Sequence, residues 1–334
     1  YLFLFLNVSS IILAKNLDRF SSAKDISSYF SGILSVNDNQ YEKSYSYLKS
    51  LNNLEGIHYN YSQYYQYSLV ALGRFKDANK YSKKLKNKEI DNFESNIISA
   101  VYYLENNDIK NASFYLKKLE SKNQPGSIQN LLSTTLNAWI NFKNIPDLES
   151  GLSLLDNIPE RFTNVKNIQK TFAYCYFDSP KTDEMFKQLI SKPDINYSRY
   201  YFFHANYLIS KNKEKKTKKV IKTSLDLYPK NLILNQLKLD LEKKKIFSNK
   251  FDCKKPADVI AEIFYIASNA FSSQNNYVLS NFYLNLAKFL NPKFVSYDAL
   301  YAENLFRIQE YEKAKSVYIK IKKKGLVYNW HASK

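Results

Sequence analysis

The chain has 334 residues, of which 45% are apolar, so it can bury a sizeable core and is too apolar for a disordered segment. Lysine and arginine (49) outnumber aspartate and glutamate (31), and the formal net charge of +18 predicts attraction to anions. The chain has 6 glycines, 3 histidines and 2 cysteines, which argues against glycine-rich phosphate loops, β-propellers and multi-histidine metal sites.

The first 14 residues, YLFLFLNVSSIILA, form a strongly apolar run. The run is short for a membrane span, and the small residue Ala14 precedes a polar chain that starts at Lys15. These features predict a signal peptide over residues 1–14, without its basic leading region, and therefore export. An uncleaved anchor, a buried first helix and a cytoplasmic location are the alternatives.

A large apolar residue then recurs at intervals of 34 residues. It is Tyr41, Phe75 and Ile109 in the first half of the chain, and Tyr277 and Tyr311 near the end. Three positions later stands a small residue: Ser44, Ala78, Ala112, Ser280 and Ala314. Because the surrounding apolar residues recur at helical spacing, each period predicts two antiparallel helices. Such pairs bury their faces only by stacking on one another.

Weaker copies of the pattern fill the middle of the chain. The segment LESGLSLLDNIP and residues 197–230, with Pro229 as a helix stop, repeat the plan, while residues 161–193 carry the faintest copy. Residues 231–256 interrupt the array, first as one helix and then as a basic loop that ends at Pro256.

In these features the chain resembles the tetratricopeptide-repeat family, and with its N-terminal run it is similar to exported bacterial members. The second helix shows the family's aromatic–x–x–small pattern, and Gly32, Ala100, Ala205 and Ala302 stand at its small first-helix position. The resemblance implies an all-α fold, an α-solenoid (superhelix) of about eight repeats, several of them degenerate. We expect repeats over 24–160, degenerate repeats over 161–230, an irregular helix and basic linker over 231–256, and further repeats, truncated at the C-terminus, over 257–334.

Repeat packing and chemistry give two further sets of expectations. The residues expected to pack between helices are Tyr41, Phe75, Ala78, Ile109, Ala112, Tyr277, Tyr311 and Ala314. The three histidines lie far apart in sequence, and His204 stands in an apolar helix, so we expect no catalytic residue, metal, cofactor or small-molecule substrate. Cys175 and Cys253 are expected about two repeats apart and hence unpaired.

The family resemblance also implies a concave groove, formed by first helices, that binds other proteins or peptides. The residues that would line it are Tyr29, Tyr64, Tyr67, Arg199, Phe202, Asn206, Tyr265, Asn269 and Arg307. The sequence thus predicts a non-catalytic scaffold or adaptor, located by its N-terminal run in a bacterial envelope, in the periplasm.

Two alternatives to this function stay open. Lysine-rich runs at 83–88, 211–222 and 320–324 could bind an anionic polymer, either nucleic acid or an acidic glycan. Their plainer interpretation is a solvated outer face enriched in lysine by AT-rich codon usage. Alternatively, the chain is the docking arm of an enzyme whose catalytic domain follows Lys334.

Overall fold

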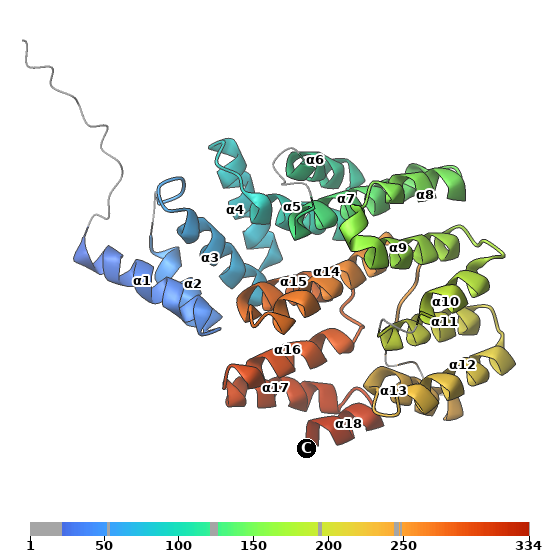
Figure 1. Ribbon diagram of the computed structural model, residues 1–334. Helices are drawn as coiled ribbons and strands as arrows, with labels where there is room; N and C mark the ends of the chain where they lie inside the picture. The colour runs from blue at the N-terminus through green and yellow to red at the C-terminus, as the bar shows by residue number, and fades with distance from the viewer. Residues whose placement is uncertain are drawn as a thin grey trace, which may run out of the picture. The chain divides into compact units, whose positions relative to one another are not determined.

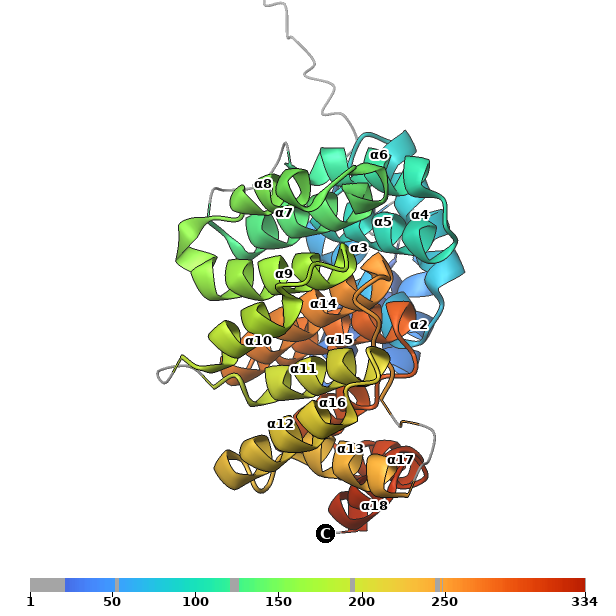
Figure 2. The same ribbon diagram turned by 90° about the vertical axis from the view of Figure 1, so that its right-hand side faces the viewer.

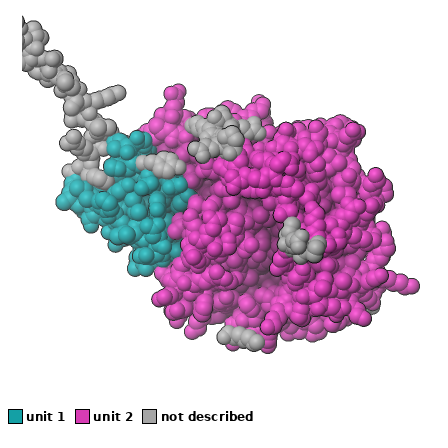
Figure 3. All heavy atoms as spheres, viewed as in Figure 1, with its two compact units in different colours: residues 1–68 teal, residues 69–334 magenta. Residues whose placement is uncertain are grey.

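The computed structural model describes residues 22–51, 54–120, 126–192, 196–243, 247 and 249–333, so the predicted signal peptide over 1–14 lies outside the described residues. The described residues form α-helices and two short 3₁₀ helices, without strands. Consecutive helices pack as antiparallel pairs (Figure 1). The predicted all-α array of helix pairs is confirmed. The chain divides into two compact units, residues 1–68 and 69–334 (Figure 3).

Unit 1 contains α1 (Ala23–Asn37), α2 (Tyr41–Lys49) and most of α3 (Tyr59–Ala71). Ser22 caps α1, because its hydroxyl accepts a hydrogen bond from the backbone N–H of Asp25. At the crossing of α1 and α2, Gly32 lies directly under Leu48, and a Cβ atom on Gly32 would stand 2.5 Å from Leu48 Cδ2. Gly32 therefore occupies the close-approach position that the repeat pattern predicts.

This crossing gives a first test of the pairing. Gly32→Ala is expected to lower the free energy of unfolding by about 1–3 kcal/mol, because the added methyl group forces Leu48 aside. Ser31→Ala, on the same helix but outside the tight crossing, is the control and should change stability by less than about 0.5 kcal/mol. Urea denaturation measures both, and equal stability of the two variants would contradict the close approach.

Unit 2 begins at Leu69, inside α3, and contains the remaining helices. In chain order they are α4 (Phe75–Asn87), α5 (Phe93–Glu105), α6 (Ile109–Glu120), α7 (Ile128–Asn141), α8 (Leu148–Asp156), α9 (Thr163–Tyr176), α10 (Thr182–Ile190), α11 (Ser198–Ser210), α12 (Glu214–Leu227), α13 (Leu232–Glu242), α14 (Pro256–Ser273), α15 (Tyr277–Leu290), α16 (Ser296–Arg307), α17 (Tyr311–Lys322) and α18 (Leu326–Ser333). Of the described helices, none is long and apolar enough to cross a membrane.

The 34-residue pattern marks the starts of second helices. Tyr41, Phe75, Ile109, Tyr277 and Tyr311 are the first residues of α2, α4, α6, α15 and α17. Two positions earlier the backbone turns through the left-handed region, at Asn39, Gly73, Asn107, Asn275 and Gln309. Asparagine and glycine tolerate that conformation best, so the turn between the helices of a pair has its own sequence signature.

Packing at these positions matches the expectation in most repeats but not in the last. The small residues Ala78, Ala112 and Ala314 are buried, and Tyr41 and Phe75 are buried with them, whereas Ile109 and Tyr277 are half-buried. For Tyr311 the expectation of packing between helices is wrong, since this residue is 54% exposed. It meets the equally exposed ring of Phe306 edge-on at 5.3 Å instead of filling a gap between helices.

The helix pair α14–α15 packs against helices that come much earlier in the sequence of unit 2. Besides pairing with α15, α14 packs on α7, and α15 contacts α5. Figures 1 and 2 show α14 and α15, in orange, beside the green helices of the preceding repeats. Every residue of α14 from Val259 to Phe264 is buried, and six consecutive helical residues point to all sides of the helix. A helix buried in this way must be enclosed by other helices, and α7, α15 and α16 all contact α14.

Candidate functional site

The inner side of α11 is covered by α14 of the same chain. Arg199 in α11 donates from Nε to Glu262 Oε1 at 2.7 Å and from Nη2 to Glu262 Oε2 at 2.6 Å. Glu262 lies in α14 and is fully buried. Burial raises the pKa of the Glu262 carboxyl, although Arg199 acts in the opposite direction. Burial alone would lower the pKa of Arg199, but the charge of Glu262 raises it. Arg199 and Glu262 thus form a buried, bidentate ion pair.

Aromatic rings complete the surroundings of the Arg199 guanidinium. Its central carbon lies 3.8 Å from the centroid of the Tyr265 ring and 4.9 Å from that of Phe294. Phe202 is buried and meets Phe294 edge-on at 5.7 Å. The face of α11 thus contacts α14 and the segment that follows α15, through charge, stacking and apolar packing together.

These contacts correct the prediction of an open groove at Arg199, Phe202, Asn206 and Tyr265. Asn206 donates from Nδ2 to the backbone oxygen of Phe251 at 2.7 Å, so the connector before α14 also covers this face. The four residues are brought together, but as an interface within the chain. The prediction is wrong for these residues because it assumed that the first helices face an open groove. In the structure α14 packs over this face of α11.

The other predicted groove residues do not join this cluster. Asn269 and Arg307 are exposed, and Arg307 pairs with Glu303 one turn away at 2.5 Å. In unit 1, Tyr29, Tyr64 and Tyr67 do gather. The rings of Tyr64 and Tyr67 lie 6.0 Å apart, and burial, followed by the nearby Tyr64, raises the pKa of Tyr29. Tyr29 and Tyr67 are buried and Tyr64 is half-buried.

Cys175 and Cys253 form a disulfide, which corrects the prediction that they are unpaired. Their Cα atoms lie 6.0 Å apart although 78 residues separate them in sequence. The estimate of two repeat spacings failed because Cys253 belongs to the connector between α13 and α14 and not to a stacked helix. That connector runs back to the end of α9, where the bond joins it.

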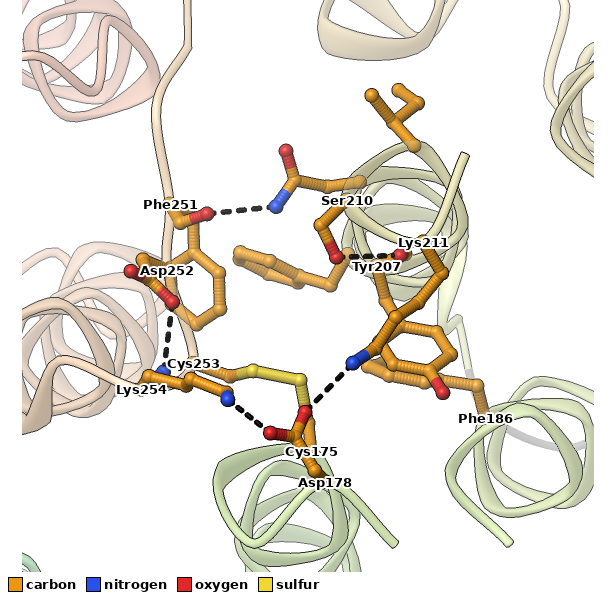
Figure 4. Close-up of a pocket in the computed structure, with 13 residues that line it drawn as sticks. Cys175, Asp178, Phe186, Tyr207, Ser210, Lys211, Phe251, Asp252, Cys253 and Lys254 are labelled. Carbon is orange, nitrogen blue, oxygen red and sulfur yellow. Dashed lines mark hydrogen bonds and ion pairs between the residues drawn. A yellow bond between two sulfur atoms is a disulfide. The ribbon is translucent and has the colours of Figure 1, made fainter. Parts of the chain in front are cut away.

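A pocket of about 470 Å³ lies beside the disulfide (Figure 4). Phe186, Phe203 and Phe251 supply apolar walls, and Asp178 accepts a hydrogen bond from Lys211 at 2.7 Å and another from Lys254. These two lysines lower the pKa of Asp178. Neither a histidine nor a free thiol stands among the lining residues, and the Ser210 hydroxyl donates to the backbone oxygen of Tyr207.

His204 is a core residue. It is fully buried, stacks on Phe186 at 5.3 Å, and its Nε2 lies 2.7 Å from Asp183 Oδ1. Burial lowers the pKa of His204, and Asp183 opposes that shift. An enclosed imidazole with this partner is positioned for packing. Within the described ranges, no group of three or more histidine, cysteine, aspartate or glutamate side chains could hold a metal ion.

Two exposed apolar features were missed by the sequence reasoning. Ile26, Phe30 and Leu34 form a stripe on α1, which we call the α1 stripe. Their spacing of four residues was the available signal. Phe114 in α6 is the second feature. It falls outside the i, i+3, i+4, i+7 pattern of the buried residues that begins at Ala112, and this was the available signal.

Comparisons with known proteins give only distant similarity. No protein-family model matches the chain, and no curated protein matches it. Among solved structures, the chain is similar to one described as a human IFIT1 dimer with PPP-AAAA, with 13% identity, coverage of 91% of this chain and 68% of that chain, and a TM-score of 0.32. It is also similar to yeast Tom70, with 12% identity, coverage of 89% and 84%, and a TM-score of 0.27.

Proposed function

We propose that the protein is a non-catalytic helical-repeat scaffold that binds a partner protein through the α1 stripe. The observation that carries the proposal is the exposure of Ile26 (42%), Phe30 (57%) and Leu34 (60%) on one face of α1. At 1.5 Å per residue the three side chains stand about 6 Å apart along a ridge about 12 Å long. The opposite face of the helix, with Tyr29, Gly32 and Val36, is buried.

The chemistry of the α1 stripe favours an amphipathic helix as its occupant. Three apolar side chains without a charge between them on the ridge select an apolar partner surface. The three side chains form a ridge of residues four apart, and a ridge of this kind packs into the groove between the ridges of a second helix. The partner proposed is therefore a protein that presents the apolar face of an amphipathic helix.

We further propose that the protein works in an oxidising compartment, namely the bacterial periplasm. The Cys175–Cys253 disulfide supports this location, because disulfides persist in oxidising compartments. The apolar run over residues 1–14 supports export on grounds of sequence alone. The core position of His204 supports a structural role for that residue and agrees with a scaffold.

Site-directed photo-crosslinking tests the partner surface. A benzophenone amino acid replaces Phe30 in one variant and Phe306 in the other, because both native side chains are 57% exposed. After irradiation in cells and purification at high salt, we expect one discrete adduct to a second protein from position 30 and none from position 306. Mass spectrometry of the adduct must identify a peptide from an amphipathic helix of the partner.

Three results would count against this proposal. A crosslink from position 30 to a second copy of this chain would show that the α1 stripe is a self-association surface and does not bind a different protein. Equal adduct patterns from both positions would show nonspecific stickiness. The absence of any adduct at position 30, with normal folding by circular dichroism, would leave the α1 stripe without a partner and reject it as the binding surface.

A further inference from the structure

We propose that the outer face of α4 and α6 binds an anionic lipid surface, with lysines reaching the headgroups and Phe114 entering the interface. The lysines concerned are Lys83, Lys86, Lys110 and Lys118, and with Phe114 they form what we call the α4–α6 patch. The proposal is independent of the α1 stripe, which lies in unit 1, whereas the patch lies in unit 2.

One lysine from each of the two helices lies over the Phe114 ring. The Nζ atom of Lys86 in α4 lies 4.4 Å from the centroid of Phe114, and that of Lys118 in α6 lies 5.9 Å from it. Lys83 lies 5.3 Å from the ring of Tyr103, and a hydrogen bond with that tyrosine raises the pKa of Lys83. These lysines are arranged around aromatic carbon.

The exposure of Phe114 is not explained by packing. Phe114 is 42% exposed, whereas the next two residues of the helix, Tyr115 and Leu116, are buried. The patch lies within the array, with α5 packed against both α4 and α6, so Phe114 does not belong to an uncovered end of the array. An apolar ring held outward between cations has the composition of an interfacial membrane contact.

Few carboxylates oppose the lysines of the patch. Asp91 lies 3.4 Å from Lys118 and is itself nearly buried. Asp108 is half-buried, and hydrogen bonds from Asn111, together with the charges of Lys110 and Lys83, lower its pKa. Four lysines stand against these two carboxylates, so the formal charge of the patch is positive. A surface of anionic phosphates complements that charge.

The number of accessible rings separates a lipid surface from single-stranded nucleic acid. Nucleic-acid surfaces stack successive bases on several accessible aromatic rings. In the patch only Phe114 protrudes, because Tyr115 is buried and Tyr103 stacks on it at 5.8 Å. One ring with lysines on long flexible stems suits a bilayer interface, into which the ring inserts while the ammonium groups stay at headgroup level.

Vesicle co-sedimentation of the whole chain tests the proposal. Vesicles of neutral phosphatidylcholine are compared with vesicles that contain 30 mol% phosphatidylglycerol, at low and at physiological salt. We expect binding to the anionic vesicles only, weakened as salt rises. Lys83→Ser/Lys86→Ser should lower the partition coefficient about 25-fold, at about 5-fold per lysine, and Phe114→Ser about 10-fold.

The matched control removes two lysines from another outer helix. Lys215→Ser/Lys219→Ser on α12 changes the net charge by the same amount at exposed positions, and we expect less than a 2-fold effect on partition. Circular dichroism confirms that all variants fold. An equal loss in the control, a Phe114→Ser variant that binds as well as the native protein, or equal binding to neutral vesicles would overturn the proposal. Binding to a single-stranded oligonucleotide that depends on Phe114, without vesicle binding, would assign the patch to nucleic acid instead.

Discussion

Arg199→Met is expected to lower the free energy of unfolding by about 3–5 kcal/mol, because it leaves the Glu262 carboxylate buried without its cation. The loss should be largest at neutral pH. Guanidinium chloride denaturation, followed by circular dichroism, measures it. Arg307→Met is the matched control, since it breaks a half-exposed Arg–Glu pair one turn apart and should cost less than about 1 kcal/mol.

The pH dependence of the Arg199→Met variant identifies the buried carboxylate as the cause. Burial already raises the pKa of Glu262 in the native protein, and removal of Arg199 takes away the group that opposes this shift. A folded-state pKa above the unfolded value means that the folded protein binds the proton more tightly. The variant should therefore recover stability relative to the native protein as pH falls from the raised pKa towards about 4.5.

The double variant Arg199→Met/Glu262→Leu completes the test. With both charges replaced by apolar groups of similar size, no uncompensated charge remains, and most of the stability should return. If the deficit of Arg199→Met stays constant between pH 8 and pH 5, or if the double variant is less stable than the single one, the ion pair is not what fastens α14 to α11.

The repeat pattern predicted the helix pairs because the interactions within a pair are local. Tyr41 and Phe75 begin second helices as expected, and their small neighbours let the helices approach. The left-handed turns at Asn39 and Gly73 were readable from the same period and were missed. Residues within one period of each other carry this information, so a single sequence is enough to find the pairs.

The covering of α11 by α14 could not be read from the period, because Arg199 and Glu262 are 63 residues apart. Two signals nevertheless existed. A charged residue inside each of two apolar helices calls for a partner, and Arg199 and Glu262 are complementary. The wide apolar face of α14, with Val259, Ile260, Ile263 and Phe264, also indicates burial. The sequence reasoning treated every repeat as open, and for that reason it assigned interior residues to a groove.

Removing the disulfide is the second large effect expected. Cys175→Ala/Cys253→Ala should lower the free energy of unfolding by about 4 kcal/mol, because the bond closes a loop of 78 residues and so restricts the unfolded chain. In the folded protein the bond ties the connector to α9, and the connector's Phe251 packs on Phe172 and Phe203, at ring distances of 5.1 and 4.4 Å. Cys175 lies in the last turn of α9, where alanine is a good helix former, and Cys253 lies in the connector, so the change interrupts no helix.

Reduction provides the control for this prediction. Dithiothreitol should lower the stability of the native protein to that of Cys175→Ala/Cys253→Ala and leave the double variant unchanged, as measured by denaturation with and without the reductant. Equal stability of the native protein in both conditions would show that the bond does not contribute to folding. A loss of about 4 kcal/mol is a large part of the 5–15 kcal/mol by which domains are usually stable. A protein that depends on the bond to this extent keeps its fold best where thiols are oxidised, so the same measurement bears on the proposed compartment.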